Sequence, residues 1–201
     1  MASKFWAGSK RLQSLAENFR PNEPPPNTGF TKRAAVLVCL FRGDGGEGDL
    51  RVILTKRSSN LSSHSGTGSF SASGKVEEGD ADDVVTALRE AKEEIGLDLL
   101  MLMSSLSPTF VTKIGMTVVP VIGVLQDRKA FIPAPNAAEV EAIFDAPLEM
   151  FLKDENRRAE EREWKGDKYF LHFFDYEADN KKFVIWALTA AHSDQNSLCC
   201  V

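Results

Sequence analysis

The 201-residue sequence contains few cysteines, few histidines and no long apolar run. Its cysteines are Cys39 and the adjacent Cys199 and Cys200, a distribution that predicts neither a disulfide framework nor a zinc site with paired ligands. The three histidines are not spaced as metal ligands, so we assign them no role. No apolar stretch approaches the roughly 20 residues that a membrane-spanning helix needs, so we expect no integral membrane protein. A reducing compartment is expected, the cytoplasm or alternatively the mitochondrion.

The sequence also has no excess of positive charge. Lysine and arginine total 24 against 29 aspartates and glutamates, which gives a net charge of -5 and a pI near 5.3. This balance argues against a general nucleic-acid surface but allows a local basic pocket for a phosphorylated ligand. We therefore expect a small-molecule partner, with no nucleic acid and no membrane. The composition, 43% hydrophobic and 26% charged, is typical of a soluble globular protein of one domain.

Proline content separates a lead-in from the folded domain. The segment PNEPPPN at 21–27 cannot be helical in its interior and predicts an extended linker. We expect residues 1–28 to form an N-terminal amphipathic helix and this proline-rich lead-in, with a weak organellar transit signal as the alternative. Residues 29–191 are expected to form the domain, and residues 192–201 a short polar tail.

Apolar and aromatic runs predict most of the strands. They cover residues 34–41, 50–57, 116–125 and 168–176, and the glycine-rich segment 43–49 joins the first two as a hairpin. Pro120 restricts its strand to a bulge or a sheet edge. Residues 138–152 are predicted to be helical until Pro147 breaks the helix, and residues 182–192 to form a closing helix or strand. This mixture predicts an α/β fold, an α/β/α sandwich on a mixed β-sheet.

Residues 74–97 contain the helical pattern around which the chain is organised. At roughly 100° per residue, the apolar face consists of Val84, Ala87, Leu88, Ala91 and Ile95. Asp80, or one of Asp82 and Asp83, is expected to cap the first turn. Gly96 is expected to end the helix in the left-handed conformation. Both ends of the helix are therefore predicted.

Three glutamates, Glu90, Glu93 and Glu94, share one flank of this helix. Like charges at such spacings cost roughly 0.2–0.5 kcal/mol per pair unless a cation or a partner neutralises them. A divalent cation is one way to neutralise them. The alternative is a solvated acidic face balanced by Arg89 and Lys92.

Residues 89–97, REAKEEIGL, resemble the second half of the Nudix box, which runs Arg-Glu-aliphatic-any-Glu-Glu-any-Gly-aliphatic. The first half carries one additional residue, as in the coenzyme A diphosphatase branch of the family and its plant members. The resemblance implies the α/β/α Nudix fold and metal-dependent hydrolysis of a nucleoside diphosphate with Mg²⁺ or Mn²⁺. It implies Glu90 and Glu94 as metal ligands. Glu93, as a ligand or general base, and Arg89, which positions the carboxylates, are the implied catalytic residues.

A second stretch is similar to the signature of coenzyme A diphosphatases. The matching residues are Ile53, Leu54, Thr55, Arg57, Ser58, Gly66 and Phe70. Ser62 replaces an arginine of that signature, and residues 71–73 replace Pro-Gly-Gly. The resemblance implies cleavage of coenzyme A or acyl-CoA to 3′,5′-ADP and 4′-phosphopantetheine or its acyl form. The implied substrate-binding residues are Thr55, Arg57, Gly74 and Lys75.

Two other functions remain open at this point. The substrate can be another nucleoside diphosphate, such as ADP-ribose or a dinucleotide. The altered segment 71–73 and the short polar end instead suit a catalytically impaired Nudix-fold binding protein. Glu139 is a candidate outer metal ligand or base, and an exposed glutamate at a helix start is its alternative reading.

Overall fold

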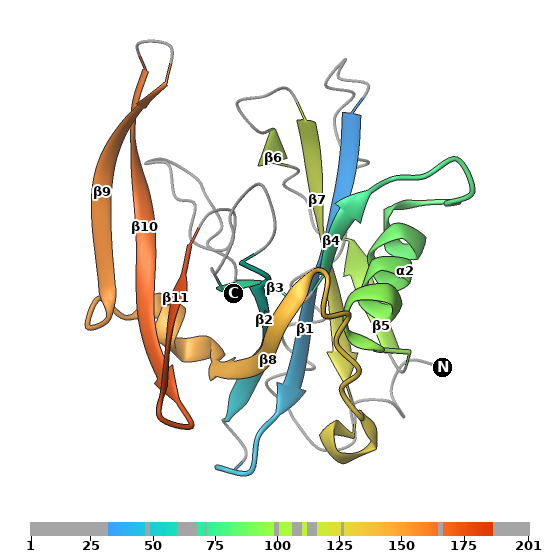
Figure 1. Cartoon of the computed structure of the whole chain (residues 1–201), viewed down its shortest axis with the longest axis horizontal. Coiled ribbons are helices and arrows are strands. Elements are labelled where there is room, and N and C mark those ends of the chain that lie inside the picture. The colour runs from blue at the N-terminus through green and yellow to red at the C-terminus, as the bar shows by residue number, and fades with distance from the viewer. Residues whose placement is uncertain are drawn as a thin grey trace.

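The computed structural model describes residues 32–46, 49–59, 68–70, 72–98, 101–105, 110–111, 116–125, 127–164 and 167–186. The expected N-terminal helix and lead-in at 1–28 and the polar tail at 192–201 lie outside the described residues, so the structure tests neither. Within the described ranges, one α-helix packs beside a large mixed β-sheet (Figure 1). The predicted α/β class is confirmed.

The described part of the chain contains eleven strands, one α-helix and two short 3₁₀ helices. The strands are β1 (Lys32–Arg42), β2 (Leu50–Arg57), β3 (Gly68–Phe70), β4 (Ala72–Lys75), β5 (Met101–Ser105), β6 (Phe110–Val111), β7 (Met116–Leu125), β8 (Val140–Pro147), β9 (Arg157–Trp164), β10 (Asp167–Ala178) and β11 (Lys181–Ile185). The helices are α2 (Asp83–Ile95), η2 (Arg128–Ala130) and η3 (Leu148–Leu152).

Strand β1 lies at the centre of the sheet, whose order is β5-β7-β1-β2-β3-β11-β10-β9. It pairs in parallel with β7 over its whole length. On its other side it pairs antiparallel with β2 near one end and with β4 near the other. The predicted hairpin of the first two apolar runs is therefore confirmed. A strand buried on both faces reads as a continuous apolar run, which explains the AAVLVCLF sequence of β1.

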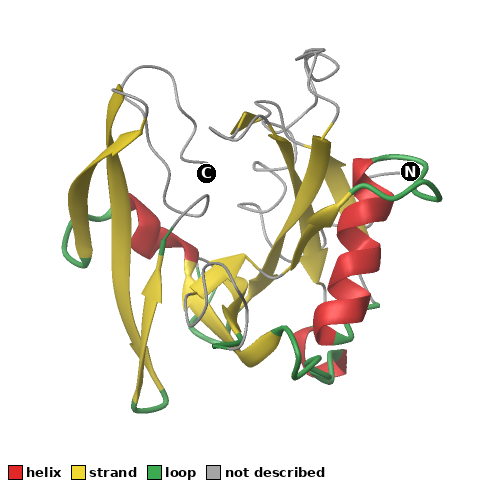
Figure 2. Cartoon of the chain, turned by 45° about the horizontal axis from the view of Figure 1, so that its top comes forward, coloured by secondary structure: helices red, strands yellow, loops and turns green. Residues whose placement is uncertain are grey.

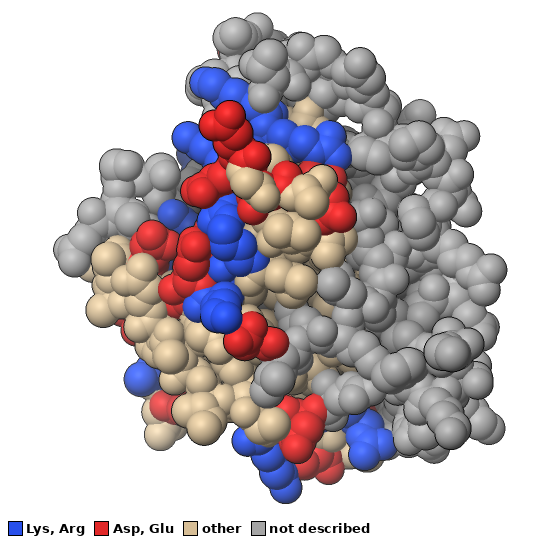
Figure 3. Space-filling model, turned by 90° about the vertical axis from the view of Figure 1, so that its right-hand side faces the viewer, with Lys and Arg blue, Asp and Glu red and all other residues tan. Residues whose placement is uncertain are grey.

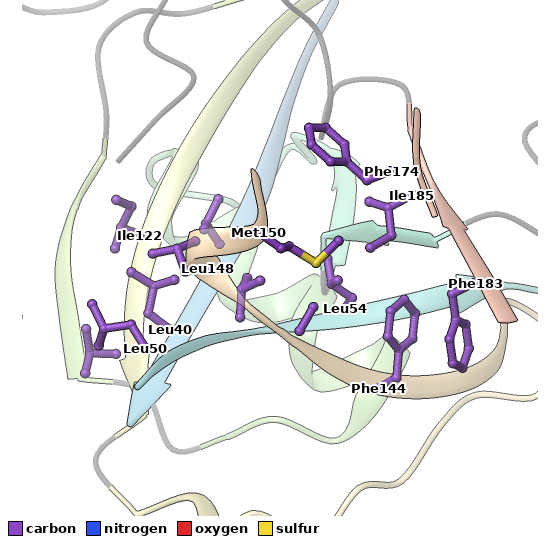
Figure 4. Packing of buried hydrophobic residues seen from close by; sticks show 14 residues of the cluster. Leu40, Leu50, Leu54, Ile122, Phe144, Leu148, Met150, Phe174, Phe183 and Ile185 are labelled. Carbon is purple, nitrogen blue, oxygen red and sulfur yellow. The ribbon is translucent and has the colours of Figure 1, made fainter. Parts of the chain in front are cut away.

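Two apolar clusters cover the two faces of the sheet. Ala87, Ala91 and Ile95 of α2 pack with the β1 side chains Leu37 and Cys39 on one face. Figure 2 shows α2 lying along this side of the sheet, away from the β9–β10 hairpin. The opposite cluster combines side chains of β1, β2 and β7 with those of β8, η3, β10 and β11 (Figure 4). Among the described residues α2 is the only α-helix, so a second helical layer is not seen there.

Pro120 lies inside the sheet, on a strand with neighbours on both sides. β5 ends its pairing with β7 at Val121, and β6 begins its pairing at Val118. Pro120 thus falls between these two short strands, where no described residue pairs with it on that side and its missing N–H removes no ladder hydrogen bond among them. β7 is nevertheless an interior strand, and its register with β1 runs through Pro120 without a shift, so the expected edge or bulge is not found among the described residues.

The helix predicted at 138–152 is wrong, because the structure has strand β8 followed by η3 there. β8 pairs antiparallel with β2, with Phe144 opposite Leu54. Phe144 stacks on Phe183 of β11, with 3.9 Å between the ring centroids. Burial alternates along part of β8, a period that fits a strand. Packing against β2 and β11 therefore overrides the local preference of this glutamate- and alanine-rich segment for a helix.

Two later segments form strands in agreement with the predictions. Residues 168–176 lie within β10, and residues 182–185 within β11, so the closing segment begins as a strand. The remainder of that segment lies outside the described residues. No helix in the described part of the chain is long and apolar enough to cross a membrane.

Candidate active site

Helix α2 begins and ends at predicted residues. Asp82 is its N-cap, and its carboxylate accepts a hydrogen bond from the backbone N–H of Val85 at 2.9 Å. Gly96 ends the helix with φ of 73°. A side chain at this glycine would also meet Ala134, so the position suits glycine on two counts.

Arg89 is the centre of a polar network on this helix. Its Nη1 donates to Glu90 at 2.9 Å and to Glu93 at 3.1 Å. Its Nη2 donates at 3.1 Å to the carbonyl oxygen of Lys75 on β4. The guanidinium therefore joins the strand before the helix to two of the three predicted carboxylates. These are the carboxylates that Arg89 is predicted to position.

Asp80 holds the other side of Arg89. Its carboxylate, only 4% exposed, accepts hydrogen bonds from Nε and Nη2 of Arg89 at 3.2 and 3.1 Å. It also accepts from the Glu77 N–H at 3.0 Å and from the Thr86 hydroxyl at 2.9 Å. These donors, with Arg89 foremost, hold the pKa of Asp80 well below its usual range. Since Asp82 forms the cap, Asp80 instead anchors the arginine, a role that sequence reasoning missed.

Glu90 has the opposite electrostatic environment. Its side chain is 15% exposed, and this burial is the main reason why its pKa is raised. The charges of Glu93 and Glu139 raise the pKa further, while Arg89 opposes the shift. A side chain at Gly74 would fall on the Glu90 carboxylate. The absence of a side chain at Gly74 therefore leaves room for the Glu90 carboxylate.

The remaining two helix glutamates differ in exposure. Glu94 is buried, at 4%, one turn after Glu90, whereas the side chain of Glu93 is 58% exposed. Glu93 is thus the carboxylate that solvent reaches. The backbone carbonyl of Glu94 accepts a 2.9 Å hydrogen bond from the N–H of Asn136, which ties the helix end to the loop at 131–139.

Glu139 belongs to this loop and directly precedes β8. The helix-start interpretation of Glu139 is therefore wrong. Its carbonyl accepts a 2.8 Å hydrogen bond from the N–H of Ser58, just after β2. Its charge acts on Glu90, as the raised pKa of that residue records. The structure thus brings a fourth carboxylate to the predicted group from a distant part of the sequence.

The predicted substrate residues lie in two places. Gly74 and Lys75 are on β4 beside α2, and the side chain of Lys75 is exposed. Thr55 is buried on β2, and Arg57 ends that strand at an irregularity in its pairing with β8. Nε of Arg57 is buried and has no hydrogen-bond partner among the described residues. Glu139 is connected to both groups of residues. Its backbone carbonyl bonds to Ser58, next to Arg57, and its charge raises the pKa of Glu90, next to Gly74.

The face of the molecule that carries α2 shows acidic and basic side chains interleaved (Figure 3). Arg89 itself contacts several of these carboxylates. Among the described residues, no three His, Cys, Asp or Glu side chains are arranged to hold a metal ion together. The donor chemistry nevertheless suits a hard divalent cation, since every nearby anionic group is a carboxylate.

Comparisons with known proteins identify the family. Residues 31–183 match the NUDIX domain. The chain is 59% identical over 176 residues to Nudix hydrolase 15, mitochondrial, of Arabidopsis thaliana, covering 87% of this chain and 60% of that protein's length. It is 49% identical to Nudix hydrolase 22, chloroplastic, of the same plant, covering 94% of this chain and 72% of the relative. The mouse peroxisomal coenzyme A diphosphatase NUDT7 is 36% identical, with 72% of this chain and 59% of NUDT7 covered.

Among solved structures, a Nudix hydrolase from Alicyclobacillus acidocaldarius is 18% identical. Its TM-score is 0.47, and the match covers 62% of this chain and 82% of that one. The identification rests instead on the domain match and on the plant relatives. The chain belongs to the NUDIX domain family.

Proposed function

We propose that this chain hydrolyses the diphosphate bond of coenzyme A or an acyl-CoA, yielding 3′,5′-ADP and 4′-phosphopantetheine or its acyl form. The observation that carries the proposal is the group of carboxylates around Arg89, in which the pKa of half-buried Glu90 is raised mainly by burial and further by Glu93 and Glu139. The choice of substrate rests on the signature at 53–70 and on the similarity to the coenzyme A diphosphatase NUDT7.

A divalent cation, Mg²⁺ or Mn²⁺, is part of this proposal. Glu90 and Glu94 lie one turn apart on α2 and would hold the ion, with substrate oxygens and water completing its ligands. Gly74 keeps the space beside Glu90 free of a side chain. When bound, the cation would neutralise charge on the diphosphate and polarise a water molecule.

The remaining residues would carry out the proton transfer and the positioning. In the reaction, a water oxygen bonds to one phosphorus atom, and the bond from that phosphorus to the bridging oxygen breaks. Glu93, the exposed carboxylate, would accept the proton from the water, with Glu139 as the second candidate base. Arg89 would fix the carboxylates, and the exposed ammonium of Lys75 would contact a phosphate. Thr55 and Arg57 would contribute to substrate recognition from β2.

Two alternatives retain support. The departures at Ser62 and 71–73 favour another nucleoside diphosphate, such as ADP-ribose or a dinucleotide. The same departures favour a binding protein with impaired catalysis. Residues 72–75 form β4 and pair with β1, so the altered segment leads directly into the strand that carries Gly74.

The test is a product analysis with purified chain. We expect release of 3′,5′-ADP from coenzyme A in saturating Mg²⁺ or Mn²⁺, faster than release of AMP from ADP-ribose, and loss of both with EDTA. Arg57→Ala should reduce coenzyme A turnover more than ADP-ribose turnover, whereas Arg42→Ala, exposed at the end of β1, should change neither. Faster ADP-ribose cleavage would support the first alternative, and no turnover of any diphosphate would support the second.

The compartment also belongs to the proposal. The two plant relatives are named mitochondrial and chloroplastic. We propose the cytoplasm or an organelle of this kind, both of which are compatible with a thiol at Cys39 that is free and buried. Imaging of the chain fused to a fluorescent protein distinguishes these compartments.

A further inference from the structure

Strand β9 forms one end of the sheet. It pairs antiparallel with β10, and no described strand pairs with its other side. Figure 1 places β9 at the outer margin of the molecule, beyond β10 and far from α2. An open edge presents unpaired backbone N–H and C=O groups, which are a template for a further strand. The partner that suits this edge can be inferred from its side chains.

The two residues on each side of Ala159 carry opposite charges, and Arg162 and Glu163 continue β9 beyond them. Arg157 and Arg158 precede this alanine, and Glu160 and Glu161 follow it. All five residues are exposed or half-buried. A strand with charge of one sign would repel a second copy of itself, whereas this arrangement is complementary to its own reversed copy.

We propose that two copies of this chain associate through β9, with the two strands antiparallel and Ala159 facing Ala159. In this register Arg158 lies opposite Glu160, and Arg157 lies opposite Glu161, each pair occurring twice about the two-fold axis. Opposite charges directly across an antiparallel pair stabilise it, and like charges destabilise it. An isologous contact of this kind closes as a dimer and leaves no further β9 edge.

Other registers are less favourable. A shift by one residue in one direction places Arg157 opposite Arg162, and a further shift places Glu160 opposite Glu160. A shift in the other direction leaves only residues 157–160 of the two strands overlapping. The Ala159-centred register therefore gives the longer pairing without like charges.

The four side chains of this register already form ion pairs within one chain, which the contact between copies would have to share or replace. Arg157 pairs with Asp154 at 2.6 Å, and Glu160 pairs with Arg162 as well as with Arg158. Arg158 bonds to Glu160 at 2.7 Å and to Asp175 at 3.2 Å, and Glu161 bonds to Lys168 at 2.7 Å. These pairs are exposed, so water already competes for them and each contributes little to stability. Each carboxylate oxygen has two lone pairs and can accept from the partner's arginine beside its present donor. The Arg158 guanidinium also lies over the Phe173 ring, 4.3 Å from its centroid, which restricts its position beside the edge.

Sedimentation of charge-swapped variants tests the dimer without any need for enzymatic activity. Arg158→Glu alone and Glu160→Arg alone each create like-charged pairs, so each should raise the dimer dissociation constant at least tenfold. An equimolar mixture of the two variants should dimerise again, since the heterodimer restores opposite charges. The double variant should also dimerise. Glu177→Arg, an exposed change of the same type on β10 outside the segment paired with β9, should leave dimerisation unchanged.

A disulfide test fixes the register. Paired residues in antiparallel strands have Cα atoms roughly 4.5–5.5 Å apart, which suits a disulfide. With Cys199 and Cys200 replaced by serine, Ala159→Cys should form a covalent dimer under mild oxidation, and Glu163→Cys should not. Circular dichroism checks that every variant is folded. A chain that stays monomeric throughout, a dimer insensitive to the charge swaps, or equal cross-linking at both positions would overturn the proposal.

Discussion

Two carboxylates on either side of Arg89 have opposite pKa shifts. Asp80 is surrounded by donors, with Arg89, Thr86 and a backbone N–H all contributing, and its pKa is lowered. Glu90 is half-buried near other acidic groups, and its pKa is raised despite the same arginine. Perturbed carboxylates that lie close together are typical of functional sites. Asp80 thus holds Arg89 in place as a carboxylate. A bound cation would favour the charged form of Glu90, which burial and the neighbouring carboxylates disfavour.

The raised pKa of Glu90 makes a prediction about pH. The folded protein holds the Glu90 proton more readily than the unfolded chain, so the wild type loses stability as pH rises from the unfolded-state pKa, about 4.3, through the higher folded-state pKa. In Glu90→Gln this loss is absent. The free energy of unfolding of the metal-free variant, minus that of the wild type, should therefore grow with pH in urea titrations. A difference that shrinks with rising pH would contradict the assignment; Glu149→Gln, on η3, is the control.

Gly74 permits the close approach of β4 to Glu90. Gly74→Ala would place a methyl group on the Glu90 carboxylate, so either β4 or the glutamate must move. We expect a loss of about 1–3 kcal/mol in the free energy of unfolding and a weaker response of thermal stability to Mn²⁺. Gly79→Ala is the matched control, since a Cβ there would meet no atom within 4 Å. Equal unfolding curves for both variants would exclude this role.

Helix α2 is held at both ends, and this fixes its carboxylates relative to the sheet. Arg33 of β1 forms a two-point ion pair with Asp83 in the first turn, at 2.6 and 2.5 Å. At the other end, Ala134 and Asn136 donate backbone hydrogen bonds to the carbonyls of Ile95 and Glu94. The loop that contains Glu139 is therefore attached to the same helix as Glu90.

Loss of the helix cap should destabilise this element by a predictable amount. Asp82→Ala removes the side-chain acceptor for the Val85 N–H and should lower the free energy of unfolding by about 1 kcal/mol. Glu78→Ala, an exposed change in the preceding turn, should have little effect. Urea denaturation of both variants measures the difference. A cost at Glu78 equal to that at Asp82 would show that capping is not the cause.

Local signals explain why α2 could be predicted from the sequence and β8 could not. The caps at Asp82 and Gly96 and the spacing of Ala87, Ala91 and Ile95 are all encoded within a few residues of each other. β8 exists because it pairs with β2, about ninety residues earlier in the chain. The local sequence of residues 138–152 does not predict that pairing.

The candidate site likewise combines residues that local sequence predicts with residues that only the fold brings close. Glu90, Glu93 and Glu94 share a helix and were predicted together, whereas Glu139 joins them only through the fold. Asp80 was recognised as an acidic residue before the helix, but its bonds to Arg89 and Thr86 depend on the turn at 77–80. The spacing of Asp80, Thr86 and Arg89 is the signal that could have indicated this anchor.

Across the whole molecule, the proposed catalytic site and the proposed dimer contact lie at opposite sides of the sheet. The proposed catalytic carboxylates lie with α2 on one side, and the open β9 edge lies at the opposite margin (Figures 1 and 2). Association through β9 would therefore leave the α2 face of each copy accessible. The two proposals rest on different residues and can fail independently.

We propose that the glutamates of α2 hold a divalent cation for hydrolysis of coenzyme A. The decisive measurement is the rate of 3′,5′-ADP release at saturating Mg²⁺ and Mn²⁺ for the wild type, Glu90→Gln, Glu94→Gln and the control Glu149→Gln. Because a bound metal supplies several kcal/mol of transition-state stabilisation, each of the two α2 variants should lose roughly 100-fold or more while remaining folded, and the control should match the wild type. Near-normal turnover by both folded α2 variants would contradict the account.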